Sequence, residues 1–282
     1  MGERERPRLG VNPTSIGVTP AWWLEAARRL EAAGFDGVYC WDHFISRGRP
    51  QTPVLECWTT LAATAAVTSR LRLGSFVNNV MNRHPSVLAR MTANIAALAP
   101  GRLDLGIGVG GNAAEAAALG IAFPDVADRV ALLEEVTAVL RALWAGGPVS
   151  YEGRWYRLTD AYAHPAPEPP PRIIVGGESP AGARLAARAG DGWTTTGEAL
   201  LRLRSAYEDA LGAAGRRRED VTVIVAVDLA PDAAPGGDPL LADLRGEAER
   251  WRERGADELV VNWVRAAQLP AVLEAAERAG LA

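Results

Sequence analysis

Lysine is absent from the 282-residue sequence, and all 30 basic residues are arginine. The chain therefore lacks the lysine of Schiff-base and pyridoxal-phosphate enzymes, of P-loop nucleotide sites and of protein kinases. Histidine and cysteine are scarce, at three and two residues, and we predict no metal site. With 34 acidic residues the net charge is −4, whereas nucleic-acid binding favours a basic stripe.

Long apolar runs are also missing. No segment approaches the roughly 20 apolar residues that span a bilayer. The first residues, MGERERPRLG, carry charges where a signal peptide has an apolar segment. We therefore expect a cytoplasmic protein with no membrane contact. Cys40 and Cys57 lack zinc-type spacing and are expected to be buried free thiols.

Helical and strand patterns alternate along the chain. Runs rich in β-branched residues predict eight strands, at Arg8–Asn12, Gly37–Asp42, Leu71–Val77, Arg102–Gly108, Arg172–Val175, Gly192–Thr196, Val221–Leu229 and Glu258–Trp263. Apolar residues at spacings of three and four predict eight helices, at Ala21–Ala33, Cys57–Thr68, Pro85–Leu98, Val126–Trp144, Ala181–Ala189, Leu200–Ala213, Leu240–Arg254 and Leu269–Ala279. Such alternation is typical of parallel strands joined by right-handed crossovers.

Eight such units most simply close into an α/β fold, the (β/α)8 TIM barrel, although a doubly wound open sheet shows the same alternation. Two segments after the fourth helix break the rhythm. Pro148–Thr159 predicts a β-hairpin, and His164–Pro171 is proline-rich and extended. Asp232–Asp238 is polar and glycine-rich but lies where a strand-to-helix loop belongs. Residues 1–282 are therefore predicted to form a single domain.

The second predicted strand ends in two titratable residues, Asp42 and His43. Active sites of such barrels lie at the carboxyl ends of the strands. A histidine there can act as an acid or base near neutral pH, and an adjacent carboxylate can set its charge. A helix-capping aspartate beside a packed histidine fits the same two residues.

The ends of the third and fourth predicted strands carry polar side chains or glycines. Asn78 and Asn79 can present amides to a heterocycle or bond their own backbone. The segment at 106–112, GIGVGGN, contains G-x-G-x-x-G. A dinucleotide site needs a second strand ending in an acidic residue about 20 positions further on, where this chain has a predicted helix. Close backbone approach to a flat ligand, with Asn112 as a polar contact, fits better.

A strand and a helix are joined by two glycines in the segment IIVGGESPAG, at 173–182. Free N–H groups at a helix N-terminus bind anions. We therefore predict that Gly176, Gly177, Glu178 and Ser179 cradle a phosphate, with the Glu178 side chain pointing away. An ordinary turn capped by Ser179 is the alternative.

Four segments taken together resemble the luciferase-like flavin and deazaflavin oxidoreductase superfamily, especially its coenzyme F420-dependent branch. They read GFDGVYCWDHF, LECWTTLAATAAVTSRLRLGSFVNN, RHPSVLARMTANIAALAPGRLDLGIGVGG and PRIIVGGESPAGARLAARAGDGW. They run in family order from about Gly34 to Trp193, with weaker similarity beyond. The resemblance implies a (β/α)8 barrel, in agreement with the alternation.

The resemblance also implies roles for single residues. It places Asp42 and His43 against the coenzyme ring and the substrate as catalytic residues, with His43 as the expected acid or base. Ser75, Phe76 and Val77 match a segment that often carries a non-proline cis peptide behind the ring, here the Phe76–Val77 bond. The other cofactor-binding matches are Asn79, Gly108, Gly110, Gly111, Asn112, Gly176, Gly177 and Ser179.

Sugar-phosphate dehydrogenases of this branch differ from the chain at specific positions. They carry a glutamate at the position of Gly111 and a tryptophan at that of Arg47, and they use lysines for the sugar phosphate. We therefore do not expect oxidation of glucose 6-phosphate.

The expected function is that of an F420-dependent oxidoreductase, which transfers a hydride between the deazaflavin and a small organic substrate. The alternative is a two-component monooxygenase using reduced FMN and O2, with a separate cofactor reductase as partner. Asp-His-Phe in place of Glu-His-His at residues 42–44 disfavours it. A barrel that binds a flavin without turnover is a third candidate. Family members are often dimers, which implies a homodimer.

Overall fold

The computed structural model describes residues 6–230 and 237–282 of the chain. Most of the predicted loop Asp232–Asp238 and the first five residues of the N-terminal segment lie outside these ranges. Among the described residues, no helix has the length and apolar character needed to cross a membrane. Cys40 and Cys57 are buried and free, as expected.

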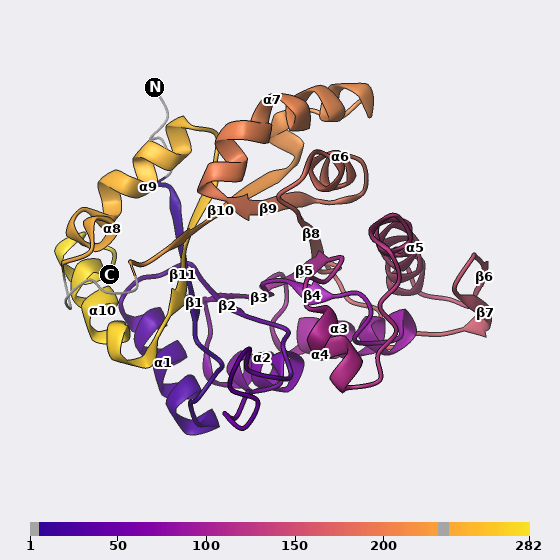
Figure 1. Cartoon of the computed structure of the whole chain (residues 1–282), viewed down its shortest axis with the longest axis horizontal. Coiled ribbons are helices and arrows are strands. Elements are labelled where there is room, and N and C mark those ends of the chain that lie inside the picture. The colour runs from indigo at the N-terminus through magenta and orange to yellow at the C-terminus, as the bar shows by residue number, and fades with distance from the viewer. Residues whose placement is uncertain (1–5, 231–236) are drawn as a thin grey trace.

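Eight parallel strands close into a barrel (Figure 1). They are β1 (Arg8–Pro13), β2 (Gly37–Cys40), β3 (Arg72–Ser75), β5 (Leu103–Gly108), β8 (Arg172–Gly176), β9 (Gly192–Thr196), β10 (Thr222–Asp228) and β11 (Glu258–Val264). Hydrogen bonds join them in the order β3–β2–β1–β11–β10–β9–β8–β5, and β5 pairs with β3 to close the ring. The (β/α)8 barrel predicted from the alternation is confirmed.

Helices surround the strands and bury their apolar faces against them (Figure 1). The long ones are α1 (Pro20–Ala32), α2 (Cys57–Val67), α3 (Pro85–Leu98), α5 (Val126–Trp144), α6 (Pro180–Ala189), α7 (Gly197–Ala213), α9 (Leu244–Glu253) and α10 (Leu269–Arg278). Two short ones are α4 (Ala113–Ala118) and α8 (Pro239–Ala242).

The largest differences from the sequence-based expectation concern three elements. Helix α4 was not predicted. The predicted helix Leu240–Arg254 divides at Asp243, whose φ of −143° and ψ of 63° interrupt it and whose carboxylate caps α9 by accepting from Gly246 N at 3.0 Å. The predicted third strand ends at Ser75, and a two-residue strand, β4 (Asn78–Asn79), pairs with β5 after it. The expected cis bond between Phe76 and Val77 lies between β3 and β4.

A small apolar cluster fills the inside of the barrel. Its buried members are Tyr39, Ile174, Ile224 and Val260, and Phe76 packs against them. The Tyr39 ring fits because neighbouring strands carry glycine: a Cβ on Gly10 or Gly74 would lie within 2.7 Å of it. These side chains therefore pack the interior of the barrel below its mouth.

The predicted hairpin follows the long helix α5 and projects beside it (Figure 1). It consists of β6 (Val149–Glu152) and β7 (Arg157–Ala161), which pair antiparallel. Glu135 of α5 holds the hairpin turn by accepting hydrogen bonds from the N–H groups of Arg154, Trp155 and Tyr156.

Candidate active site

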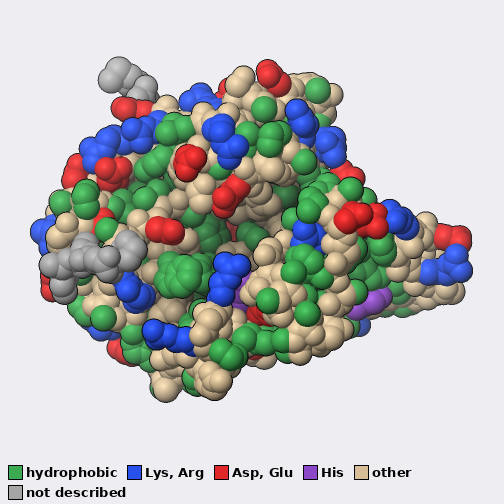
Figure 2. Space-filling model, in the orientation of Figure 1, with side chains coloured by type: hydrophobic (Ala, Val, Ile, Leu, Met, Phe, Trp, Pro, Cys, Tyr) green, Lys and Arg blue, Asp and Glu red, His purple; other side chains and the backbone are tan. Residues whose placement is uncertain are grey.

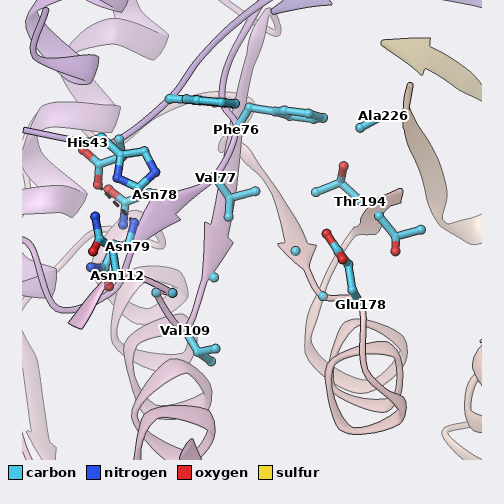
Figure 3. Close-up of a pocket in the computed structure, with 18 of the residues that line it drawn as sticks. His43, Phe76, Val77, Asn78, Asn79, Val109, Asn112, Glu178, Thr194 and Ala226 are labelled. Atoms are coloured by element: carbon cyan, nitrogen blue, oxygen red, sulfur yellow. Dashed lines mark hydrogen bonds between the residues drawn. The ribbon is translucent and has the colours of Figure 1, made fainter. Parts of the chain in front are cut away.

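A cavity of about 530 Å³ opens where the barrel strands end. Figure 2 shows this face of the molecule hollowed near its centre, and Figure 3 shows the side chains around the cavity. It is lined by most of the predicted site residues, namely Asp42, His43, Phe76, Val77, Asn79, Gly108, Gly110, Gly111, Asn112, Gly176, Gly177 and Glu178. The structure thus brings together residues from strands far apart in the sequence.

Val77 extends into the middle of this group (Figure 3). It fits because its neighbours on β5 and β8 lack side chains. A Cβ on Gly108 would lie 2.7 Å from the Val77 Cγ2 atom, and a Cβ on Gly176 would lie 3.0 Å from it. The glycines of the motif at 106–112 therefore admit Val77 as part of the cavity wall.

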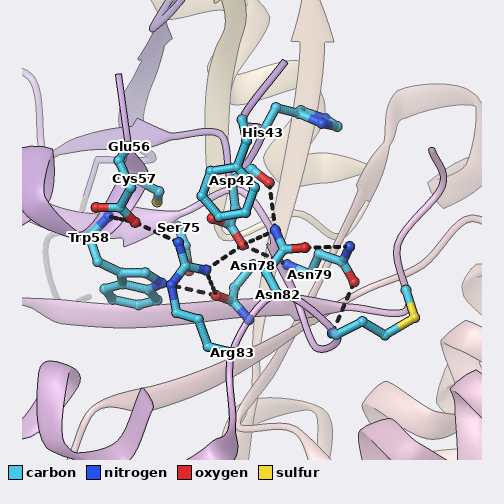
Figure 4. Close-up of polar contacts among 12 residues, drawn as sticks. Asp42, His43, Glu56, Cys57, Trp58, Ser75, Asn78, Asn79, Asn82 and Arg83 are labelled. Atoms are coloured by element: carbon cyan, nitrogen blue, oxygen red, sulfur yellow. Dashed lines mark hydrogen bonds and ion pairs between the residues drawn. The ribbon is translucent and has the colours of Figure 1, made fainter. Parts of the chain in front are cut away.

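Asp42 forms a network with the loop after β4 (Figure 4). Its Oδ2 atom accepts hydrogen bonds from Asn79 N at 3.0 Å, Asn82 Nδ2 at 3.0 Å and the Arg83 guanidinium at 2.8 Å. Arg83 also pairs with Glu56 at 2.5 Å. Burial opposes the charge on Arg83, but its bonds to Asp42 outweigh this and raise the pKa of Arg83. Through these contacts Asp42 stabilises the conformation of the loop. Its predicted catalytic role stays a prediction.

His43 lies against a carboxylate that the sequence analysis did not select. Its Nδ1 atom is 2.8 Å from Oε2 of Glu115, on helix α4. The other oxygen of Glu115 accepts from the N–H groups of Phe44 at 2.6 Å and Ile45 at 2.9 Å. Burial alone would raise the pKa of Glu115, but the bonds from His43, Ile45 and Phe44 lower it. Glu115 is therefore an ionised partner for the imidazole.

Three buried polar atoms on described residues that line the cavity have no protein partner. They are the amide nitrogen of Asn78, the hydroxyl of Thr195 and the Oδ1 atom of Asp42, of which the first two are donors. The Asn78 oxygen is occupied, since it accepts from Trp58 Nε1 at 2.9 Å and from Arg83 at 3.2 Å. Buried donors without partners cost free energy. A polar ligand with acceptor atoms in the cavity would satisfy both donors, so the residues present fit a deazaflavin or flavin ring.

The predicted phosphate cradle is only partly available. Gly177 N donates to the Thr194 carbonyl at 3.1 Å, and the Ser179 hydroxyl caps α6 by accepting from Gly182 N at 3.2 Å. Ser179 is not among the residues that line the cavity. Glu178 was expected to point away, but its side chain extends toward the cavity beside Thr194 (Figure 3). That expectation was wrong because the turn directs Glu178 inward; phosphate binding itself stays a prediction.

Ser75 also lies outside the cavity lining. It is buried, and its hydroxyl donates to the Gly106 carbonyl at 2.8 Å. This bond joins β3 to β5 just before the cis bond between Phe76 and Val77. The direct coenzyme contact predicted for Ser75 stays untested.

The sequence held a signal for Glu115. Asn112 caps α4 by accepting from Glu115 N at 3.3 Å. Asparagine followed three residues later by glutamate resembles a capping box, which marks the start of a helix. That pattern locates α4, but the contact with His43 depends on the barrel placing β2 and β5 on either side of β3.

Residues 6–235 match a family model described as luciferase-like monooxygenase. The chain belongs to this family. An F420-dependent glucose-6-phosphate dehydrogenase of Microbacterium testaceum is 32% identical over 226 residues, which are 78% of this chain and 67% of that protein. One of Intrasporangium calvum is 36% identical over 239 residues, 81% of this chain and 71% of that protein. The resemblance to the F420-dependent branch is thereby confirmed.

Solved structures share the fold of this luciferase-like chain. An F420-dependent secondary alcohol dehydrogenase in complex with an F420-acetone adduct aligns with a TM-score of 0.80 at 20% identity, covering 95% of this chain and 99% of the other. A monooxygenase from Streptomyces bottropensis aligns with a TM-score of 0.75 at 24% identity, covering 96% of both chains.

Proposed function

We propose that this chain is an F420-dependent oxidoreductase acting on a small organic substrate. The observation that carries the proposal is His43, an imidazole paired with an ionised carboxylate at the wall of a cavity that also offers two unpartnered donors. The matches span two thirds or more of the length of relatives that are named as F420-dependent, and this supports the choice of coenzyme.

The residues that would hold the coenzyme ring come from two places at the barrel mouth, the segment from Val77 to Asn78 and the end of β9. Val77 would support one face, while Asn78 and Thr195 would donate to its polar edge. When bound, the deazaflavin accepts or supplies the hydride. The protein positions the two reactants, and His43 takes up or delivers the proton that accompanies the hydride.

The charge of the cavity supports a substrate other than a sugar phosphate. Of the carboxylates in its described lining, Asp42 is paired with Arg83 behind the wall and Glu115 with His43. Among the described residues, Glu178 has no ion-pair partner and no arginine lines the cavity. A phosphate on the substrate would meet like charge there. We therefore propose an uncharged substrate, in contrast to the dehydrogenases named above.

The test is a binding titration of the purified protein against coenzyme F420 and FMN in parallel. Tryptophan quenching and the fluorescence of the ligand report binding. Micromolar or tighter binding of F420 with weak FMN binding is expected, followed by F420 reduction or oxidation with a panel of alcohols and carbonyl compounds. Preferential FMN binding with substrate-dependent oxygen consumption would instead indicate the two-component monooxygenase. Binding without turnover on any substrate would indicate a flavin-binding barrel.

His43→Ala tests the acid or base role. Turnover should fall about 10²- to 10⁴-fold while the dissociation constant of F420 stays unchanged, because the imidazole acts on the proton. His164→Ala, in the segment after the hairpin, is the matched control and should retain turnover. Full activity of His43→Ala would remove His43 from the mechanism.

A homodimer, a cytoplasmic location and a separate cofactor reductase stay predictions for this protein. The assignment of residues 1–282 to one domain also stays a prediction. Light scattering on the purified protein decides the oligomeric state, and the FMN arm of the titration decides whether a reductase partner is needed.

A further inference from the structure

Glu115 is fixed by contacts at both of its oxygens. Oε2 faces His43 Nδ1 at 2.8 Å, and Oε1 accepts from two successive backbone N–H groups, those of Phe44 and Ile45. Its side chain is 7% exposed, whereas that of His43 is 39% exposed. The carboxylate thus binds both the ring of His43 and the backbone just after it.

This arrangement decides which ring nitrogen carries the proton. A carboxylate only accepts hydrogen bonds when ionised. A neutral imidazole held 2.8 Å from it must therefore place its proton on Nδ1. The Nε2 atom is left without a proton and is the nitrogen available to a ligand in the cavity.

We infer that Glu115 is a positioning residue that fixes His43 in the Nδ1–H tautomer, so that Nε2 accepts a proton from a hydroxyl group of the substrate. In that step the O–H bond breaks and an Nε2–H bond forms. The electron pair left on oxygen would form the C=O bond as the C–H bond breaks and its hydride passes to the oxidised coenzyme of the proposed function, and the proton on Nε2 later leaves to solvent. Glu115 then stabilises the resulting imidazolium by its negative charge. The tautomer stands on the contact between Nδ1 and Oε2 and on an ionised Glu115, while the substrate hydroxyl rests on the proposed function.

The substitution Glu115→Gln makes a sharp test because the amide has one oxygen where the carboxylate has two. That oxygen is required by the N–H groups of Phe44 and Ile45. The amide NH₂ then faces His43 Nδ1 and donates to it. The substitution should therefore invert the tautomer to Nε2–H and leave no acceptor toward the cavity.

The experiment is ¹⁵N NMR of histidine-labelled protein without coenzyme, across about pH 5 to 9. The chain has three histidines, so His84→Gln and His164→Gln assign the signals. In the wild type, His43 should be in the Nδ1–H form at the alkaline end of the range, and in Glu115→Gln it should be in the Nε2–H form. Glu178→Gln removes another carboxylate from the cavity wall and should leave the His43 tautomer unchanged.

Two results would overturn the inference. One is a wild-type His43 that carries a proton on Nε2 at the alkaline end, as the other tautomer or as imidazolium. The other is an unchanged Nδ1–H form in Glu115→Gln. The wild-type spectrum decides by itself if Glu115→Gln does not fold.

Activity is measured separately. Glu115→Gln should lower kcat at least about 100-fold and shift the pH profile, with little change in the dissociation constant of F420. Absence of F420 turnover in the wild type would refute the proposed function and leave the NMR result intact. An inverted tautomer with normal kcat would refute the proton transfer from the substrate.

Discussion

Gly108 shows at the scale of one residue how a missing side chain shapes the cavity. A Cβ there would lie 2.7 Å from Val77 Cγ2, closer than carbon atoms pack. Gly108→Ala should therefore lower the free energy of unfolding by about 1–3 kcal/mol and weaken ligand binding, because Val77 must move. Urea denaturation measures the first effect.

Gly111 provides the matched control for that substitution. It lies three residues further on in the same cavity wall, and a Cβ there meets nothing within 4 Å. Gly111→Ala should change the free energy of unfolding by less than about 0.5 kcal/mol. Equal losses from both alanines would show that the contact with Val77 does not explain the glycine at 108.

The role of Asp42 can be separated from that of His43 by removing its ionic partner. Arg83 is 10% exposed on its side chain and Asp42 is fully buried on its side chain. Arg83→Met leaves a buried carboxylate without its counter-ion and should destabilise the protein by about 3–5 kcal/mol. Arg157→Met removes the exposed pair with Glu152 and should have a much smaller effect in the same denaturation assay. A small loss for Arg83→Met would mean that this ion pair does not explain the buried position of the Asp42 carboxylate.

The sequence pattern is informative for a residue whose position along a strand places it at the cavity. His43 follows directly from its place at the end of a strand, and it lies on the cavity. Glu115 was missed because its partner is 72 residues away in the chain, and Ser75 was selected although its hydroxyl is used inside the barrel wall. Periodicity locates the ends of strands but does not give which partner the last side chain of a strand will find.

At the scale of elements, one side chain, that of Glu135, connects α5 to the hairpin that follows it. Glu135 accepts from three N–H groups of the turn between β6 and β7. Glu135→Ala removes these acceptors and should speed amide hydrogen exchange in the turn at least about tenfold, because the turn opens locally. The neighbouring Glu134→Ala removes only an exposed contact with Arg188 and should leave the turn unchanged. Uniform faster exchange over the whole protein would mean that Glu135 supports the barrel instead.

The order of strands and helices was predicted more completely than the breaks within helices and the short helices between them. Alternating strand and helix patterns depend on many residues each, so the eight units and the hairpin were predicted correctly. The division at Asp243 and the six residues of α4 depend on single caps, where one side chain competes with the helix for backbone bonds. The effect of a single cap is hard to detect from hydrophobic periodicity, because periodicity is averaged over a helical turn or more.

At the scale of the whole molecule, charges buried near the amino ends of the strands tie the barrel together. Asp104 accepts from Arg72 at 2.5 Å and from Arg172 at 2.7 Å. Burial opposes its ionisation, but the bonds from Arg172 and Arg72 lower the pKa of Asp104. Glu258 accepts from the Tyr39 hydroxyl at 2.6 Å, yet burial dominates and raises its pKa. The two carboxyls therefore give stability opposite dependences on pH.

Because the two pKa shifts have opposite directions, substitutions of Glu258 and Asp104 should change the free energy of unfolding with opposite dependences on pH. Because the folded pKa of Glu258 lies above its unfolded value, its contribution is complete at acid pH and is lost as the pH rises through the folded pKa. Glu258→Gln keeps an acceptor for Tyr39 and removes that loss. It should match the wild type below about pH 4 and become more stable than the wild type as the pH rises.

Asp104→Asn should behave in the opposite way, since the pKa of Asp104 is lowered and its contribution is lost as the pH falls through that value. At neutral pH it leaves two arginines without their buried partner, at a cost of about 3–5 kcal/mol that shrinks toward acid. Urea denaturation at several pH values measures both differences. A pH-independent difference for Glu258→Gln would mean that Glu258 ionises as readily in the folded barrel as in the unfolded chain.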